Sequence, residues 1–249
     1  MTDIANNNAD YRLVYWPIPG RGEFIRLCLE HAGARWVDTP GGVDEVMGYV
    51  EGRAELGDDS PQPLFPPILR DEKEGVVLAQ TAAILSYLAP KLGLDGEGAA
   101  AQAHVLQHAL TGLDLNDEAH NTHHPIAAML YYEDQKTEAL RYAEVFRRER
   151  IPKFLNYLET NLARNTASNH TCLVGSSRTY ADYVWWQVVD GLLFAFPKRM
   201  QTVLASYPHI KNFHQHIKAD ERIAAYLASE RRLPYSDGVF RHYAELDAE

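Results

Sequence analysis

The spacing of hydrophobic residues changes character near Gly93, and this change predicts two parts of different structure. Before Gly93, short apolar runs of strand length alternate with runs of helical spacing. Tyr11–Trp16 is rich in β-branched and aromatic residues and predicts a strand. A cluster of prolines and glycines up to Gly22 predicts a turn after it. From Glu23 the apolar positions fit one helical face, and Gly33 supplies the end of that helix.

The other elements predicted before Gly93 are shorter. Strands are expected at Val37, over 64–70 and over 76–78, and a helix over 82–88. Residues 40–63 between them carry only a weak, polar pattern. The order β-α-β-α followed by β-β-α suggests a thioredoxin-like half.

Helical spacing dominates after residue 99. Helices are predicted over about 99–120, 126–162, 180–195, 200–206 and 208–228. Thr179 and Asp182 form a carboxylate variant of the capping box at the start of one of them. The expected fold class is an α/β N-terminal thioredoxin-like domain followed by an all-α C-terminal domain, with fewer than four strands after residue 100. Its expected divisions are a flexible tail over 1–10, the first domain over 11–90, a linker over 91–98, and the helical domain with a C-terminal extension over 99–249.

Composition narrows the classes of function. The chain has 249 residues, and its net charge of −10 argues against an extended surface for nucleic acid. Its two cysteines, Cys28 and Cys172, lack metal-binding spacing and are expected to be buried thiols in a reducing compartment. No apolar run approaches the ~20 residues of a membrane-spanning helix, and the N-terminus lacks the apolar core of a signal peptide. We therefore expect a cytoplasmic protein without nucleic-acid or membrane partners.

The first predicted strand and helix place a phenol beside a helix N-terminus. Tyr15 lies at the end of the strand and faces the helix that begins near Glu23, where unpaired N–H groups favour anions. A phenol that donates to a thiolate contributes about 1.5–3 kcal/mol. That energy lowers the pKa of a bound thiol by about one to two units. From position alone, a tyrosine packed in the core is the simpler interpretation of Tyr15.

The stretch YRLVYWPIPGRGEFIRLCLEHAG, residues 11–33, resembles the start of the cytosolic glutathione transferases of the tyrosine type, close to the pi and sigma classes. Residues 67–90 and 179–190 also carry the resemblance, which covers nearly the whole chain. It implies that Tyr15 stabilises the thiolate of glutathione, the co-substrate, for attack on a small hydrophobic electrophile. The turn after Tyr15 contains neither the serine nor the cysteine that other transferase types use.

The resemblance further implies a set of residues that bind glutathione. Pro67 would be the family's cis-proline, and the carbonyl of Pro66 would face the cysteinyl group, although Pro66 lacks the N–H that family members offer there. Gln80 and Thr81 would bind the γ-glutamyl group, and Thr81 would also cap the helix that follows. Arg21 would act electrostatically near the thiol; a local ion pair is the alternative.

The remaining site residues also come from the resemblance. Arg53 would replace the family's lysine or tryptophan at the glycyl carboxylate. Asp114 falls where pi-class proteins carry an aspartate that reaches across the dimer to the γ-glutamyl amine, which implies a homodimer; a solvated helix carboxylate is the alternative. His120, His123 and His124 fall where the family lines its electrophile pocket. Their helical spacing could also suit zinc or an exposed polar helix, but no carboxylate or cysteine completes a metal site.

A second class of function stays open. Pro66, together with the missing lysine and tryptophan, favours a non-catalytic glutathione-transferase-like binding or interaction protein that retains the fold. The fold alone does not decide between the two classes. Glutathione S-transferase activity is the leading prediction.

Overall fold

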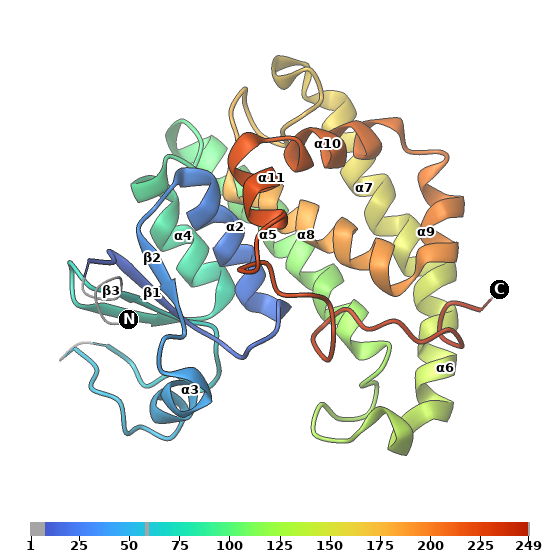
Figure 1. Ribbon diagram of the computed structural model, residues 1–249. Helices are drawn as coiled ribbons and strands as arrows, with labels where there is room; N and C mark the ends of the chain where they lie inside the picture. Colours follow the sequence, from blue (N-terminus) through green and yellow to red (C-terminus); the bar gives the residue numbers. More distant parts are fainter. Residues whose placement is uncertain (1–7, 58–59, 249) are drawn as a thin grey trace. The chain divides into compact units, whose positions relative to one another are not determined.

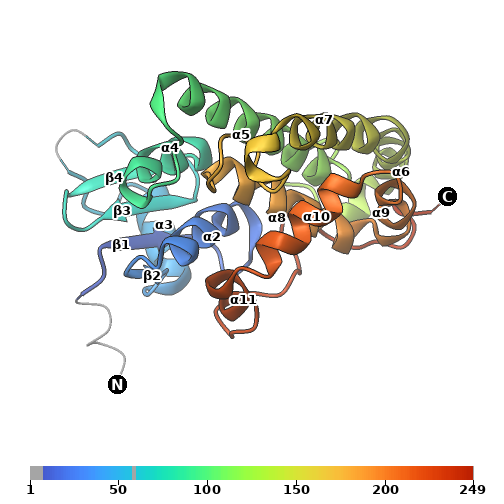
Figure 2. The same ribbon diagram turned by 90° about the horizontal axis from the view of Figure 1, so that it is seen from above.

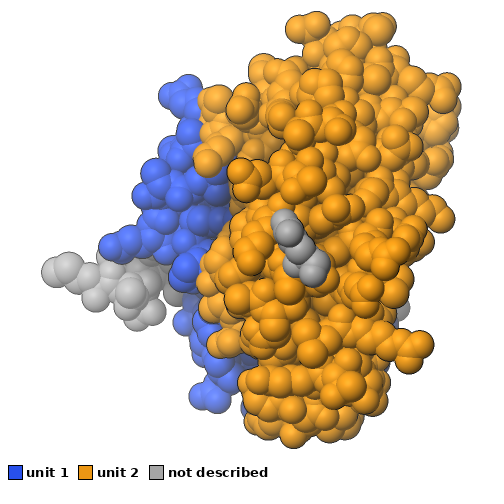
Figure 3. Space-filling view, turned by 90° about the vertical axis from the view of Figure 1, so that its right-hand side faces the viewer, with its two compact units in different colours: residues 1–95, 221–234 blue, residues 96–220, 235–249 orange. Residues whose placement is uncertain are grey.

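The computed structural model describes residues 8–57 and 60–248, and the chain forms two compact units (Figure 3). The first unit runs to Asp95 and also takes in Glu221–Pro234. The second comprises Gly96–Asp220 and the segment from Tyr235 onward. We expected residues 99–249 to form one domain, whereas 221–234 belong to the first unit. Of the tail expected over 1–10, residues 1–7 lie outside the described residues; Asp10 is held, because its N–H donates to the carbonyl of Arg35 at 2.8 Å.

The first unit is built on a four-stranded mixed sheet in the order β2-β1-β3-β4 (Figure 1). Its strands are β1 (Tyr11–Val14), β2 (Trp36–Asp38), β3 (Ile68–Asp71) and β4 (Val76–Ala79). β1 pairs in parallel with β2 and antiparallel with β3, and helix α2 (Glu23–Ala32) connects the parallel pair. This is the thioredoxin-like arrangement that the order of elements predicts. β3 begins later than expected because the two prolines before it have no N–H to donate to a ladder.

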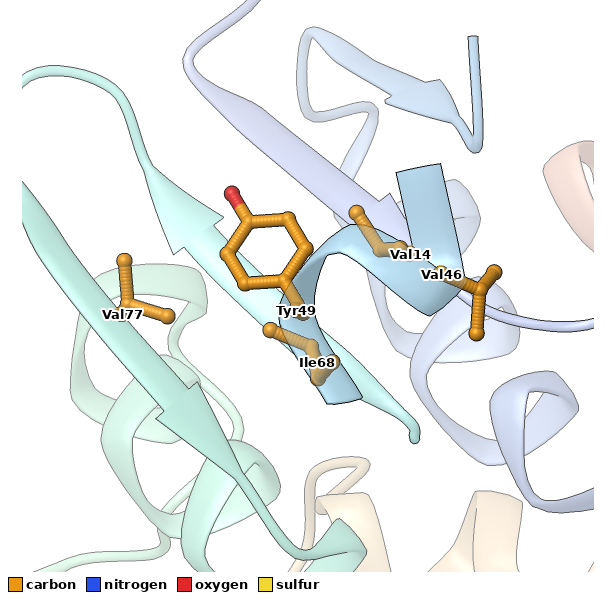
Figure 4. Close-up of a cluster of buried hydrophobic side chains, with 5 residues drawn as sticks. All are labelled: Val14, Val46, Tyr49, Ile68 and Val77. Atoms are coloured by element: carbon orange, nitrogen blue, oxygen red, sulfur yellow. The ribbon is translucent and has the colours of Figure 1, made fainter. Parts of the chain in front are cut away.

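One face of this sheet packs against helix α3 (Gly42–Val50). Side chains alternate between the two faces of a strand, so Val14, Ile68 and Val77 point to the same side. They form a buried cluster with Val46 and Tyr49 of α3 (Figure 4). The sequence did not predict α3, because only a narrow apolar stripe marks it within a polar stretch that starts with two glycines.

The opposite face carries Leu13 and Leu69, which are buried. Helices α2 and α4 (Thr81–Leu92) lie together on this side (Figure 2), and the single turn η1 (Gly20–Gly22) leads into α2. Helix α11 (Glu221–Leu227), from the late segment of the first unit, packs against α2. Gly33 ends α2 in the left-handed conformation with φ 65°, as its position in the sequence predicts.

The second unit is helical. Its elements are α5 (Gly98–Asn121), η2 (Tyr132–Gln135), α6 (Lys136–Val145), the π-helical turn η3 (Phe146–Arg150), α7 (Ile151–Arg164), η4 (Thr166–Ser168), α8 (Tyr180–Ala195), α9 (Pro197–Leu204) and α10 (Pro208–Lys218). No strand occurs among its described residues, in agreement with the predicted all-α domain. Across residues 8–57 and 60–248, none of the helices is both long and apolar enough to cross a membrane.

Helix α8 forms the core of the second unit and packs along α5. Trp185 and Trp186 are buried, and Trp185 donates its indole N–H to the carbonyl of His108 at 2.8 Å. The predicted capping box is present at the start of α8: Asp182 accepts the N–H of Thr179 at 2.8 Å. Asp182 also accepts the N–H of Leu173 at 2.8 Å, so this cap joins the preceding loop to the helix.

Two helix predictions in this part of the chain were wrong in extent. The pattern over 126–162 predicts one helix, but residues 122–131 are irregular. Pro125 interrupts helical hydrogen bonding there, and the side chain of Gln135 accepts the N–H of Ile126 at 2.9 Å. The pattern over 208–228 likewise divides into α10 and α11.

Candidate active site

Three predicted site segments meet at one end of the sheet. Val14 pairs with Ile68, and Ile68 pairs with Ala79, so these three residues form one row across β1, β3 and β4. Tyr15 follows Val14 and Gln80 follows Ala79. Because β3 runs antiparallel to both neighbours, Pro67 is the residue that precedes its member of the row. The register therefore brings the phenol, the proline pair and the start of α4 to the same edge.

Tyr15 is held in a closely fitted environment. Its side chain is 5% exposed, and its hydroxyl oxygen accepts the backbone N–H of Arg21 at 2.9 Å. Gly20 and Gly22 let the turn approach the ring. A Cβ at Gly22 would lie 2.8 Å from a ring carbon of Tyr15, and one at Gly20 would overlap the hydroxyl. The turn predicted from the glycines thus serves to bring a backbone N–H to the phenol.

The backbone of Tyr15 is fixed by Thr39, which sequence reasoning missed. The Thr39 hydroxyl accepts the N–H of Tyr15 at 2.9 Å and lies 2.9 Å from the Tyr15 carbonyl, to which it can donate. The N–H of Thr39 donates to Leu13 at 2.7 Å. Thr39 follows a three-residue strand and has φ 39°, an unusual value for a β-branched residue. The role of Thr39 is visible only from its hydrogen bonds to Tyr15, which lies 24 positions away in the sequence.

The protonation state of Tyr15 follows from two opposed effects. Burial raises the pKa of the phenol, while the Arg21 N–H lowers it by a smaller amount, so the pKa lies above its usual value of 10.0. At neutral pH the hydroxyl keeps its proton. Because the oxygen already accepts from Arg21, its own hydrogen is available to donate to another group. The site thus presents a neutral hydrogen-bond donor rather than a base.

The proline pair adopts the predicted geometry, since the Pro66–Pro67 peptide bond is cis. Pro67 is buried, and Pro66 is partly exposed. The prediction that Thr81 caps the next helix was wrong by one position. Gln80 is the N-cap residue of α4, with φ 73° and an exposed side chain, and Thr81 is the first helical residue. The hydroxyl of Thr81 is buried and has no hydrogen-bond partner within the protein.

Among the described residues, no hydrogen bond or ion pair joins Arg53 to this edge. Its side chain is 60% exposed and pairs with Glu51 at 2.8 Å. Arg21 differs, because its backbone bonds to Tyr15 and its side chain is partly exposed.

The other predicted site residues belong to the second unit. Asp114 is exposed on α5. His120, His123 and His124 form a cluster at the end of α5, with ring centroids 4.7–5.1 Å apart. A ring nitrogen of His123 lies 2.9 Å from the Val239 carbonyl. Burial lowers the pKa of His123 to about 3 and also lowers that of His124, so both imidazoles are neutral at neutral pH. Across the described residues, no three His, Cys, Asp or Glu side chains are grouped to hold a metal.

A cavity of about 240 Å³ lies beside Tyr15 within the first unit. Apolar side chains, among them Trp16, Val43 and Leu233, form part of its lining. Arg26 and Asp38 also line it and pair with each other at 2.7 Å. Leu233 comes from the late segment that joins this unit after α11.

Comparison with known proteins relates the chain to glutathione S-transferases. Residues 120–230 match the model of the glutathione S-transferase C-terminal domain. Glutathione S-transferase P 1 of Xenopus laevis is 24% identical over 89% of this chain and 93% of its own length. A glutathione S-transferase of Dirofilaria immitis is 28% identical over 88% and 92%. Over most of its length the chain is similar to glutathione S-transferases. A mu-class relative, glutathione S-transferase Mu 1 of Macaca fascicularis, is 26% identical over 89% of the chain.

Solved structures support the same fold. The pi-class glutathione S-transferase of Onchocerca volvulus matches with a TM-score of 0.68 and 24% identity, covering 87% of this chain and 91% of that one. The glutathione S-transferase of Ascaris lumbricoides matches with a TM-score of 0.65 and 23% identity over 91% of this chain and 98% of its own. In this fold, Tyr15, Pro67 and Gln80 lie next to the row of Val14, Ile68 and Ala79 and form one candidate site.

Proposed function

We propose that this protein is a glutathione S-transferase of the tyrosine type, close to the pi and sigma classes, in which Tyr15 stabilises the thiolate of bound glutathione. One observation carries the proposal: the buried Tyr15 hydroxyl accepts the Arg21 N–H and so has its own hydrogen free to donate. The thiolate sulfur attacks an electrophilic carbon and forms a C–S bond. When the electrophile carries a halide, the C–halogen bond breaks, the halide leaves with the electron pair, and the thiol proton passes to solvent.

Glutathione binding rests on the sheet edge next to Tyr15. The buried, unpartnered hydroxyl of Thr81 lies in the first turn of α4, where backbone N–H groups favour a carboxylate. Thr81 and Gln80 bind the γ-glutamyl group, and the carbonyl of Pro66 accepts from the cysteinyl N–H. Arg21 adds positive charge near the thiol. Arg53, on its exposed turn, is the candidate for the glycyl carboxylate.

The second unit supplies the other proposed contacts. Asp114, exposed on α5, reaches across a homodimer to the γ-glutamyl amine of the glutathione bound to the partner subunit. His120, His123 and His124 line the electrophile pocket, where burial lowers the pKa of His123 and His124 and keeps these two imidazoles neutral. Cys28 and Cys172 are buried thiols and form no disulfide, which supports a cytoplasmic protein, because oxidising compartments favour disulfides. Light scattering at micromolar concentration tests the dimer; a single species of 28.1 kDa would contradict it.

The test of catalysis is Tyr15→Phe, assayed by conjugation of glutathione to chlorodinitrobenzene. Loss of about one to two pKa units of thiol stabilisation predicts turnover lower by roughly ten- to a hundredfold at neutral pH. The deficit shrinks as pH rises, because the thiol then ionises without help. Glutathione affinity changes little, since it rests on the residues of the α4 start and the backbone. Tyr49→Phe is the matched control: Tyr49 is also 5% exposed in the first unit but lies on α3.

Two results would contradict the proposal in different ways. Equal activity of Tyr15→Phe and the wild type would remove Tyr15 from the chemistry. A wild-type protein that neither conjugates nor binds glutathione would favour the non-catalytic binding protein, for which the missing N–H of Pro66 is the structural argument.

A further inference from the structure

The late segment of the first unit reaches the start of α2 through buried polar contacts. The hydroxyl of Tyr226 donates to the carboxylate of Glu23 at 2.8 Å, and Arg232 forms an ion pair with the same carboxylate. Glu23 is fully buried, and the Arg232 side chain is 10% exposed. A carboxylate in such a place is stable only when it is paired and hydrogen-bonded.

Glu23 belongs to a group of four charges, of which only Asp38 is exposed. Its carboxylate also lies 3.2 Å from the guanidinium of Arg26, which in turn bonds Asp38 at 2.7 Å. Two positive and two negative groups therefore balance, with Arg26 only 1% exposed. Removal of Arg232 would leave a net negative charge in this group, where a low dielectric makes an unbalanced charge costly.

This group holds the turn that approaches Tyr15. One nitrogen of Arg26 donates to the carbonyls of Ile18 at 3.2 Å and Pro19 at 3.0 Å. The N–H of Glu23 also donates to Pro19, at 3.0 Å. These two carbonyls directly precede Gly20 and Arg21, whose backbone supplies the N–H that bonds the Tyr15 hydroxyl. The guanidinium carbon of Arg26 also lies 5.8 Å from the Tyr15 ring centroid.

The same segment reaches the cavity beside Tyr15 through Leu233, the residue after Arg232. Residues 226–233 thus touch the Tyr15 environment in two ways: through the charges at the start of α2 and through the cavity wall.

We propose that Tyr226 and Arg232 are positioning residues, which act through Glu23 and Arg26 to hold the Ile18–Arg21 turn and to balance charge next to Tyr15. The expected effect on conjugation rests on the proposed function of Tyr15. The expected hold on the Ile18–Arg21 turn does not. Charged groups that face Glu23 are Arg26 from α2 and Arg232 from the late segment, and Asp38 at the end of β2 pairs with Arg26.

The experiment compares two neighbouring arginines changed in the same way. Arg232→Gln removes the ion pair to Glu23 at the start of α2. Arg231→Gln is the matched control, because Arg231 pairs with Glu30 near the other end of the same helix. Two readouts are measured in the full chain: the pH profile of kcat/KM for glutathione conjugation, and hydrogen exchange of the peptide that contains Arg21.

Arg232→Gln is expected to raise the pKa in the kcat/KM profile by about half a unit to one unit, and so to lower kcat/KM at neutral pH roughly three- to tenfold. Exchange at the Arg21 amide should quicken about tenfold. Arg231→Gln should change each value less than twofold. Tyr226→Phe removes one oxygen and keeps the ring, and it should also quicken exchange at the Arg21 amide. This variant tests the positioning role even where Arg232→Gln does not fold.

Equal behaviour of the two arginine variants, or unchanged Arg21 exchange in Tyr226→Phe, would overturn the positioning role. An inactive wild type would instead show that the proposed function fails. In that case the exchange measurement still decides whether residues 226–233 hold the turn, so the two failures are distinguishable.

Discussion

Buried histidines should lower the free energy of unfolding of the second unit as the pH falls. The size of this change can be calculated for His123 and His108. His123 is 1% exposed and His108 is 7% exposed. Burial is the largest cause that lowers the pKa of each, to about 3 for His123 and to about 4 for His108, from the ordinary value of 6.5. The folded protein therefore binds fewer protons at these sites than the unfolded chain once the pH falls below 6.5. Acid then favours unfolding.

The magnitude follows from the width of that window. At pH 5 each unfolded histidine is almost fully protonated and each folded one is neutral. The interval that counts for each site is therefore the difference between its unfolded pKa of 6.5 and pH 5, about 1.5 units. At about 1.36 kcal/mol per unit this is about 2 kcal/mol each. Between pH 7.5 and 5, the free energy of unfolding should thus fall by about 4 kcal/mol through the two residues. Arg241 and the neighbouring His120 and His124 act in the same direction on His123.

The assay is urea unfolding at both pH values, with glutamine variants that cannot titrate. His123→Gln and His108→Gln should each lose about 2 kcal/mol less than the wild type over this interval. His104→Gln is the control, because His104 is exposed one helical turn before His108 on α5. If either buried variant loses as much stability with acid as the wild type does, within about half a kcal/mol, the reasoning from burial is wrong for that site.

Two further predictions test the packing around the sites. In the conjugation assay, Gly22→Ala should displace the Tyr15 ring and lower turnover at least tenfold, because the new Cβ would lie 2.8 Å from that ring. Gly48→Ala on α3, where nothing lies within 4 Å of the new Cβ, should leave turnover unchanged. Asp247 accepts the N–H groups of Lys198 at 2.8 Å and Arg199 at 3.2 Å at the start of α9. Asp247→Ala should therefore lower the free energy of unfolding by about 1–2 kcal/mol, whereas the exposed Asp237→Ala should cost less than about 0.5 kcal/mol; equal thermal melting of the two variants would count against the cap.

Local signals in the sequence predicted much of the first unit's site. The strand that ends near Tyr15, the proline- and glycine-rich turn and Gly33 at the end of α2 each act through neighbouring residues, which is why a linear pattern reveals them. The cis Pro66–Pro67 bond was predicted from the family resemblance and is confirmed. The roles proposed for Tyr15, Gln80 and Thr81 stay predictions.

Contacts between distant segments could not be predicted in the same way. Thr39 holds Tyr15 across 24 positions, and Tyr226 bonds Glu23 across 203. No periodicity encodes such pairs, because each depends on how separate elements meet. Helix α3 was missed for a related reason: its stability comes from burying Val46 and Tyr49 on the sheet rather than from its own sequence pattern.

The assignment of residues 221–234 to the first unit has a consequence for synthesis. A chain emerging from the ribosome presents the β-sheet, α2 and α4 long before Tyr226 and Arg232 exist. Until then Glu23 lacks two of its partners, so the sheet can form early while the turn before α2 stays loosely held. The Tyr15 environment is completed only after the whole of α5 to α10 has been made. Folding during synthesis therefore completes this environment late, although Tyr15 itself is translated well before Tyr226 and Arg232.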